Sequence, residues 1–185
     1  MIYFIRHGES EANVRKVFAG QKDDSLLTNE GKEQAKATAQ EIKKEGLKID
    51  KIFSSPLKRA YETAEIIAKE LGFDTSEIII EKRIMEYDMG DLSGTPWHTI
   101  SSAILVGVEN AEDPDEFSAR ACSCVQELSK LPGNILLVSH AGVGRILETV
   151  REGMDAKLFY DLPPYKNASI TKIDWIDAET KFSEI

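Results

Sequence analysis

Four basic residues in this sequence are suited to chemistry on an anion: Arg6, His7, Arg59 and His140. The planar guanidinium of arginine matches the oxygens of a phosphate group, and a neutral imidazole is a competent nucleophile toward phosphorus. Each residue alone has an ordinary structural explanation, such as a solvated helix position or a hydrogen-bonded imidazole in the core. The four together indicate an anion site, and the candidate chemistry is phosphoryl transfer.

Short apolar runs precede these residues and predict the strands that hold them. Three runs predict buried strands: residues 2–5 before Arg6 and His7, residues 52–53 shortly before Arg59, and residues 135–138 before His140. Two further runs, at 78–80 and 168–176, are also strand candidates. We expect the last of them to be an edge strand.

Helical patterns alternate with these runs. Four helices are predicted. The first spans 28–45, with Thr28 as N-cap and Gly46 at its end, and the second has Ser55 as N-cap, Pro56 at its first position and Gly72 at its end. The third runs from Asp115 to the break at Pro132, and the fourth carries Val143, Ile146, Leu147 and Val150. The alternation predicts an α/β fold, a three-layer αβα sandwich whose central sheet is mainly parallel, with helices on both faces and an edge strand near the C-terminus. Such sheets bind ligands outside the carboxyl ends of their strands, where the four basic residues fall.

Three motifs carry a resemblance to a known family. They are Arg6-His7-Gly8-Glu9-Ser10, Ser54-Ser55-Pro56-Leu57-Lys58-Arg59-Ala60 and Ser139-His140-Ala141-Gly142. In this order and spacing they resemble the signatures of the histidine phosphatase, or phosphoglycerate mutase-like, superfamily. The resemblance extends through most of the chain, at Asn13, Phe18-Ala19-Gly20, Leu27-Thr28-Asn29-Glu30-Gly31, Glu86 and Asn167-Ala168-Ser169-Ile170.

The resemblance implies a role for each catalytic candidate. His7 would be the nucleophile that becomes phosphorylated, and Arg6, Arg59 and His140 would hold the phosphoryl oxygens. Glu86 would protonate the leaving group, and among the nearby acidic residues only Glu86 fits the family position, directly after the apolar Met85. Nearby cations disfavour protonation of His7 and attract the substrate, so no metal is required and no cofactor is expected.

Three further residues are candidates for substrate binding. Asn13 and Gly20 fall where the family contacts the transferred phosphate or the neighbouring part of the substrate, although both are also ordinary structural choices. Ser10 is expected at a helix N-terminus, as Ser55 is, and backbone amides there would add donors for an anion. After Glu86, the chain places Leu92 where many family members carry tryptophan.

The resemblance leaves three activities open. Mutases of the family carry a Glu-Arg-His-Tyr-Gly stretch around the acid, whereas here Glu86 is followed by Tyr87-Asp88-Met89-Gly90. The chain is also shorter than a typical mutase, which favours an open site that admits water. We therefore expect a phosphatase that hydrolyses a small organic phosphomonoester and resembles the broad-specificity and α-ribazole-phosphate phosphatases. The alternatives are a 2,3-bisphosphoglycerate-dependent phosphoglycerate mutase and a protein phosphohistidine phosphatase or signalling partner.

We expect a single domain over residues 1–185 with one short insert at about 95–112. The insert holds the apolar run 103–108 beside acidic residues, and its place between Glu86 and the next helix predicts a lid that sets specificity. A short and partly apolar lid suits a small ester better than a polyphosphate. His98 in this segment has no counterpart in the family motifs, and the apolar residues around Ile104 could instead mark a homodimer surface.

Composition excludes some partners. Asp and Glu outnumber Lys and Arg by 32 to 23, which gives a net charge of −9 and a mean field that repels nucleic acid and anionic membranes. The longest apolar run is far shorter than a membrane span, so a cytoplasmic protein is expected. Cys122 and Cys124 are two residues apart within a helical pattern and are expected to be free thiols, with Cys124 in the core.

Overall fold

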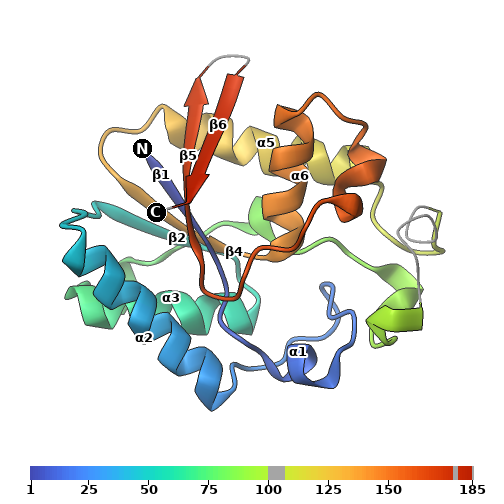
Figure 1. Cartoon of the computed structure of the whole chain (residues 1–185), viewed down its shortest axis with the longest axis horizontal. Coiled ribbons are helices and arrows are strands. Elements are labelled where there is room, and N and C mark those ends of the chain that lie inside the picture. The colour runs from blue at the N-terminus through green and yellow to red at the C-terminus, as the bar shows by residue number, and fades with distance from the viewer. Residues whose placement is uncertain (100–106, 177–178, 185) are drawn as a thin grey trace.

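The structure is a computed structural model of the chain, and it describes residues 1–99, 107–176 and 179–184 (Figure 1). Its centre is a six-stranded sheet in the order β3-β2-β4-β1-β5-β6. The strands are β1 (Ile2–Arg6), β2 (Lys51–Ser54), β3 (Ile79–Ile80), β4 (Ile135–Ser139), β5 (Ile170–Ile176) and β6 (Glu179–Glu184). The pairs β1–β4, β2–β4 and β2–β3 are parallel, and β5 is antiparallel to both β1 and β6. The predicted α/β fold with a mainly parallel sheet is confirmed.

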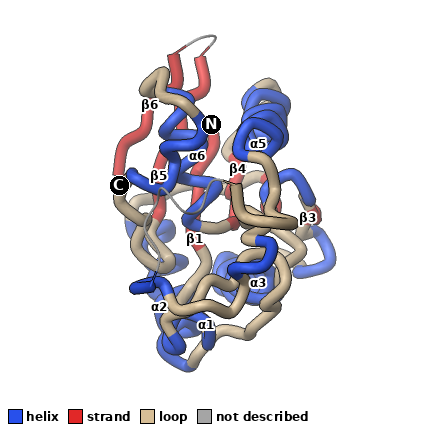
Figure 2. Tube along the Cα trace, turned by 90° about the vertical axis from the view of Figure 1, so that its right-hand side faces the viewer, coloured by secondary structure: helices blue, strands red, loops and turns tan. Residues whose placement is uncertain are grey.

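The C-terminal edge of the sheet differs from the prediction. The strand expected at the edge, β5, lies between β1 and β6. The additional strand β6 pairs with β5 over its whole length and becomes the edge itself (Figure 2). Its sequence alternates charged and apolar residues only briefly, so hydrophobic periodicity gives little indication of this strand.

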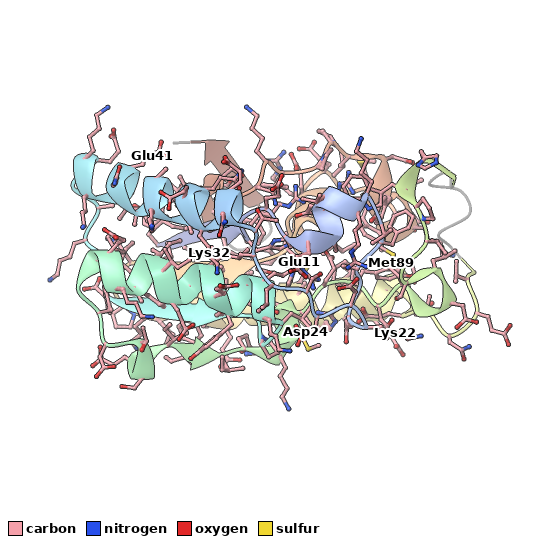
Figure 3. All side chains as sticks on the ribbon, turned by 90° about the horizontal axis from the view of Figure 1, so that it is seen from below. Glu11, Lys22, Asp24, Lys32, Glu41 and Met89 are labelled. Carbon is pink, nitrogen blue, oxygen red and sulfur yellow. The ribbon has the colours of Figure 1, made fainter. Side chains whose placement is uncertain are left out.

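Helices cover both faces of the sheet. They are α1 (Glu11–Arg15), α2 (Asn29–Lys44), α3 (Lys58–Leu71), α5 (Pro114–Ser129) and α6 (Ala141–Arg151). In Figure 1, α2 and α3 lie on one side of the strands and α5 and α6 on the other. Figure 3 looks onto the first pair, where Lys32 of α2 forms an ion pair of 3.0 Å with Glu62 of α3.

Two hydrophobic cores follow from the alternation of strand side chains. Phe4 of β1 and Leu137 of β4 pack with Phe117 and Cys124 of α5 and with α6. Tyr3, Ile5, Leu136 and Val138 lie on the opposite face and pack with α2 and α3. Because successive strand residues point to opposite faces, short strands that are buried on both sides read as continuous apolar runs.

Two helix ends agree with the sequence and one differs. Thr28 caps α2 by accepting a hydrogen bond from the backbone of Gly31, and Gly72 ends α3 with a φ of 82°. The prediction that Ser55 caps α3 is wrong, since the helix begins at Lys58 after Leu57. The predicted helix with Val143, Ile146, Leu147 and Val150 is confirmed as α6, and Val150 in its last turn is exposed.

The insert predicted as a lid is only partly described. Most of its apolar run falls on residues 100–106, outside the described residues. Of its described part, Trp97 lines a cavity that Arg6 and His7 also line, and His98 is exposed. Within residues 1–99, 107–176 and 179–184, no helix is both long and apolar enough to cross a membrane.

Candidate active site

Three parallel strands end beside one another and bring the candidate residues to one edge of the sheet. The amide of His7 extends the ladder past β1 by donating to the carbonyl of Ser139, at 2.9 Å. The amide of Ser55 does the same past β2 by donating to Val138, at 3.0 Å. A cavity of about 710 Å³ opens there. Its lining includes seven of the eight predicted site residues: Arg6, His7, Ser10, Asn13, Gly20, Arg59 and Glu86.

His7 is oriented for attack by its own backbone neighbour. Its Nδ1 lies 2.7 Å from the carbonyl oxygen of Gly8, which can only accept a hydrogen bond. Nδ1 therefore carries the proton, and Nε2 keeps its lone pair. Burial, followed by the positive charges of Arg59 and Arg6, lowers the pKa of His7 well below its ordinary value. The imidazole is thus neutral and nucleophilic at physiological pH.

The imidazole of His140, the eighth predicted residue, lies beside the imidazole of His7. Its ring centroid is 5.2 Å from that of His7 at an angle of 61°. Nε2 of His140 lies 2.8 Å from Oγ of Ser55, while its buried Nδ1 has no hydrogen-bond partner in the described part of the chain. Burial and then the charge of Arg59 lower the pKa of His140 well below its ordinary value.

Arg6 and Arg59 provide the fixed positive charge. Arg59 is 1% exposed and donates from Nη1 to the carbonyl of Asp23 and from Nη2 to that of Gly20, at 2.9 and 2.8 Å. Nη1 of Arg6 donates to the carbonyl of Tyr165, and its Nε is buried without a partner in the described residues. Burial lowers the pKa of Arg6 to about 10, which still leaves it charged at neutral pH. Two desolvated guanidinium groups held by carbonyls are suited to bind a phosphoryl dianion.

Glu86 is held by backbone amides on both oxygens. Oε1 accepts from the amide of Tyr87 at 2.9 Å, and Oε2 accepts from the amide of Gly142 in the first turn of α6, at 3.2 Å. The backbone carbonyl of Glu86 also accepts from Nε2 of Gln21, at 2.9 Å. The carboxyl group therefore has a defined position in the wall of the cavity.

Arg120 of α5 holds the segment that carries Glu86. Its Nη1 donates to the carbonyls of Arg83 and Met85, both at 2.7 Å, and its Nη2 donates to that of Glu86 at 3.0 Å. Glu112 pairs with the same guanidinium at 2.5 and 2.8 Å. Three hydrogen bonds from one side chain thus fix three carbonyls within residues 83–86, and two more hold the guanidinium on Glu112.

Ser10, Asn13 and Gly20 line the cavity, each with a structural function as well. Ser10 caps α1 in a capping box with Asn13. Oδ1 of Asn13 accepts from the amide of Ser10 and from Nδ2 of Asn167, at 3.0 and 3.2 Å, so only its amide NH₂ remains to meet a ligand. Gly20 supplies one of the two carbonyls that hold Arg59.

Sequence reasoning assigned no function to four polar residues of the cavity wall: Arg145, Tyr160, Asp161 and Asn167. Asn167 stands in a stretch that carries the family resemblance, but its hydrogen bond to the carbonyl of His7, at 3.1 Å, is visible only in the structure. Arg145 follows Ala141 at helical spacing, which was a usable signal. Tyr160 comes from a short 3-10 helix (Ala156–Asp161) that no periodic pattern indicates.

No group of three or more His, Cys, Asp and Glu side chains within residues 1–99, 107–176 and 179–184 is placed to hold a metal ion. Cys124 is buried in the core and Cys122 is half-buried, both as free thiols.

The chain is similar both to phosphoglycerate mutases and to phosphatases. A 2,3-bisphosphoglycerate-dependent phosphoglycerate mutase of Thermoplasma acidophilum is 29% identical over 175 residues, which cover 92% of this chain and 84% of the relative. The protein named "Putative phosphoserine phosphatase 2" of Hydrogenobacter thermophilus is 29% identical over 185 residues, covering 93% and 88%. The solved structure of a phosphoserine phosphatase variant of Entamoeba histolytica superposes with a TM-score of 0.80 at 23% identity, covering 99% of this chain and 94% of that one.

The family model of the histidine phosphatase superfamily (branch 1) matches residues 2–185. That match spans every strand of the sheet and every residue of the cavity described above. The chain belongs to the histidine phosphatase superfamily, branch 1.

Proposed function

We propose that this protein is a phosphomonoesterase that hydrolyses a small organic phosphate ester through a phosphohistidine on His7. The observation that carries the proposal is the state of His7: a buried, neutral imidazole whose Nδ1 is hydrogen-bonded to the carbonyl of Gly8, which leaves the lone pair on Nε2, in a cavity with Arg6 and Arg59. A neutral imidazole, kept so by burial and by two neighbouring guanidinium groups, is suited to attack a phosphoryl group that those guanidinium groups bind.

In the first step, Nε2 of His7 attacks phosphorus and the bond from phosphorus to the ester oxygen breaks. Arg6 and Arg59 bind the equatorial oxygens, where negative charge spreads in the transition state. Nδ1 of His140 is a further buried donor without a hydrogen-bond partner in the described residues. The leaving alkoxide takes a proton from the carboxyl group of Glu86 and departs as an alcohol.

In the second step, a water molecule attacks the phosphohistidine and the bond from phosphorus to Nε2 breaks. Glu86, now a carboxylate, takes the proton of the attacking water. His7 regains its lone pair and inorganic phosphate leaves. The net reaction consumes one ester and one water and yields one alcohol and one phosphate, and it calls for no metal ion, because the two arginines neutralise the phosphoryl charge.

A phosphoglycerate mutase is the second candidate, and the named relatives include one. A mutase must return the phosphoryl group to a bound intermediate, which calls for cations beyond the phosphoryl site. The stretch after Glu86 is Tyr87-Asp88-Met89-Gly90, which contains no cation, whereas mutases of the family carry arginine and histidine there. This difference favours hydrolysis over return of the phosphoryl group.

The test compares wild type with His7→Ala against a panel of phosphomonoesters, with chelator and without added metal. The panel includes 3-phosphoglycerate with a bisphosphate primer, and both free phosphate and isomerised product are measured. Phosphate release that is lost in His7→Ala supports the proposal. Isomerised product without phosphate release supports the mutase instead. If wild type is inactive on every small ester, a protein-bound phosphohistidine becomes the substrate to test.

A further inference from the structure

Arg145 is a nearly buried cation that the mechanism above does not use. It stands on α6, it is 9% exposed, and it lines the same cavity as His7. Its Nε is buried and has no hydrogen-bond partner in the described residues. No carboxylate of the described residues lies within ion-pair distance of it, whereas Arg120 is paired with Glu112.

A buried cation without a carboxylate partner is costly in a folded protein. Arg6 and Arg59 meet this cost in part through backbone carbonyls. The described residues provide no such carbonyl for Arg145. Its placement is therefore explained best by an anionic group that arrives with the ligand.

An aromatic ring fixes the guanidinium of Arg145. Its central carbon lies 4.7 Å from the ring centroid of Tyr160. The ring of Tyr160 is held in turn by edge contacts with Phe159 and Phe18, at centroid distances of 5.0 and 6.0 Å. A guanidinium stacked on a fixed ring keeps its NH edge for a planar partner.

The phosphoryl group already has its own cations. Arg145 is near enough to Arg6 for its charge to lower the pKa of Arg6, but it stands on α6 over the ring of Tyr160, whereas Arg6 stands at the end of β1. Two separate positive positions in one cavity fit a ligand with two negative groups.

The second negative group is best a carboxylate. The wall near Arg145 offers one guanidinium and one tyrosine, and the rest of the lining includes the apolar Val17, Met89 and Trp97. Asp161 also lines the cavity and disfavours a second dianion. A planar monoanion matches the guanidinium fork with two parallel hydrogen bonds. We propose that Arg145, stacked on Tyr160, determines specificity by binding a carboxylate of the substrate, so that the enzyme takes phosphomonoesters that carry a carboxylate.

This inference rests on the proposed phosphatase function, and matched substrate pairs separate the two. O-phosphoserine and phosphoethanolamine differ by one carboxylate, and 3-phosphoglycerate and glycerol 3-phosphate differ by a carboxylate in place of a hydroxymethyl group. For each pair, kcat/KM is measured with wild type, Arg145→Gln and Arg145→Lys. Arg151→Gln is the matched control, because it removes an arginine of the same helix that pairs with Glu148 and Glu152 outside the cavity.

We expect wild type to prefer the carboxylate member of each pair. Arg145→Gln should lower kcat/KM for that member by about ten- to a hundredfold, mainly through KM, and bring the ratio within each pair toward one. Arg145→Lys keeps the positive charge without the guanidinium fork, so its kcat/KM ratio within each pair should lie between those of wild type and Arg145→Gln. Arg151→Gln should keep the wild-type ratio. Equal losses on both members, or no preference in wild type, would overturn the inference.

A binding measurement covers the case in which no ester is turned over. His7→Ala, with and without Arg145→Gln, is titrated with phosphoserine and with phosphoethanolamine by calorimetry, and thermal unfolding confirms that each variant is folded. Tighter binding of phosphoserine that disappears with Arg145→Gln supports the carboxylate site even if hydrolysis fails. Equal affinity for the two ligands contradicts it, whatever the activity of the enzyme.

Discussion

The hydroxyl of Ser55 lies 2.8 Å from Nε2 of His140, and both side chains are fully buried. Ser55 follows β2 and His140 follows β4, two strands that are neighbours in the sheet. The same hydroxyl accepts from the amide of Leu57, at 3.3 Å. Donation from Ser55 to Nε2 leaves the proton of His140 on Nδ1, the nitrogen without a protein partner in the described residues. Ser55 therefore positions His140 for the substrate.

Ser55→Ala should lower activity through His140. The variant leaves Nε2 unpaired in the core, which we expect to cost about 1–3 kcal/mol of folding stability and to lower kcat about tenfold. Ser54→Ala is the matched control, because the Ser54 hydroxyl donates only to the carbonyl of Ser55. Urea unfolding and steady-state kinetics of both variants check this. A Ser54→Ala enzyme as impaired as Ser55→Ala would contradict a specific role for Ser55.

Gly142→Ala should displace the acid without unfolding the protein. A Cβ at this position would lie 2.0 Å from Oε1 of Glu86, the mobile end of a side chain. We expect alkyl phosphate hydrolysis to fall about a hundredfold, as after loss of a general acid, with a much smaller loss on p-nitrophenyl phosphate, whose leaving group needs no proton. Added to Glu86→Ala, the substitution should have no further effect, and an additive loss would refute this coupling.

Arg120→Gln should impair Glu86 from a distance. Arg120 holds the carbonyls of Arg83, Met85 and Glu86, so its loss should loosen this segment and lower stability by about 2–4 kcal/mol. If Arg120 positions Glu86, kcat should fall more on alkyl esters than on p-nitrophenyl phosphate. Arg83→Gln, which removes the ion pairs with Glu81 and Glu127, is the control and should change kcat on both substrates by the same factor.

Stability should decrease as the pH falls below about 6.5, the ordinary pKa of histidine. The folded state lowers the pKa of His7 and His140, so below this pH the unfolded chain binds protons that the folded chain does not. Each histidine then removes about 1.4 kcal/mol per pH unit until its folded pKa is reached. His7→Asn should reduce this slope, measured by urea unfolding between pH 7 and 5, relative to wild type. The exposed His98→Asn is the control, and equal slopes in all three proteins would contradict the prediction.

Local signals in the sequence were sufficient for much of the fold and of the site. Apolar runs that end in Arg6-His7 and before His140 predicted both the strands and the side of the sheet where those residues meet. Thr28 and Gly72 marked helix ends because their own side chain or backbone geometry ends the helix. The four basic residues meet at one edge of the sheet for these reasons, whereas Glu86, Asn13 and Gly20 were predicted from the family resemblance and line the same cavity.

The remaining features depend on contacts between distant segments. Ser55 looked like a helix cap, but its partner is the imidazole of His140, 85 residues away in the chain. Arg120 is an ordinary polar residue in the pattern of α5, and only the fold shows that it holds carbonyls 34 to 37 residues earlier. Arg145 and Tyr160 meet across a turn between α6 and a 3-10 helix that periodicity does not indicate.

The central claim is that His7 carries the phosphoryl group, and trapping that intermediate tests it most directly. Wild type and His7→Asn are mixed with an excess of p-nitrophenyl phosphate in the presence of chelator, quenched under alkaline conditions that preserve phosphohistidine, and analysed by intact and peptide mass spectrometry. We predict one added phosphoryl group per wild-type chain, on the peptide that contains His7, and none on His7→Asn. Release of phosphate by wild type with no modified peptide, or with the phosphoryl group on another residue, would contradict the account.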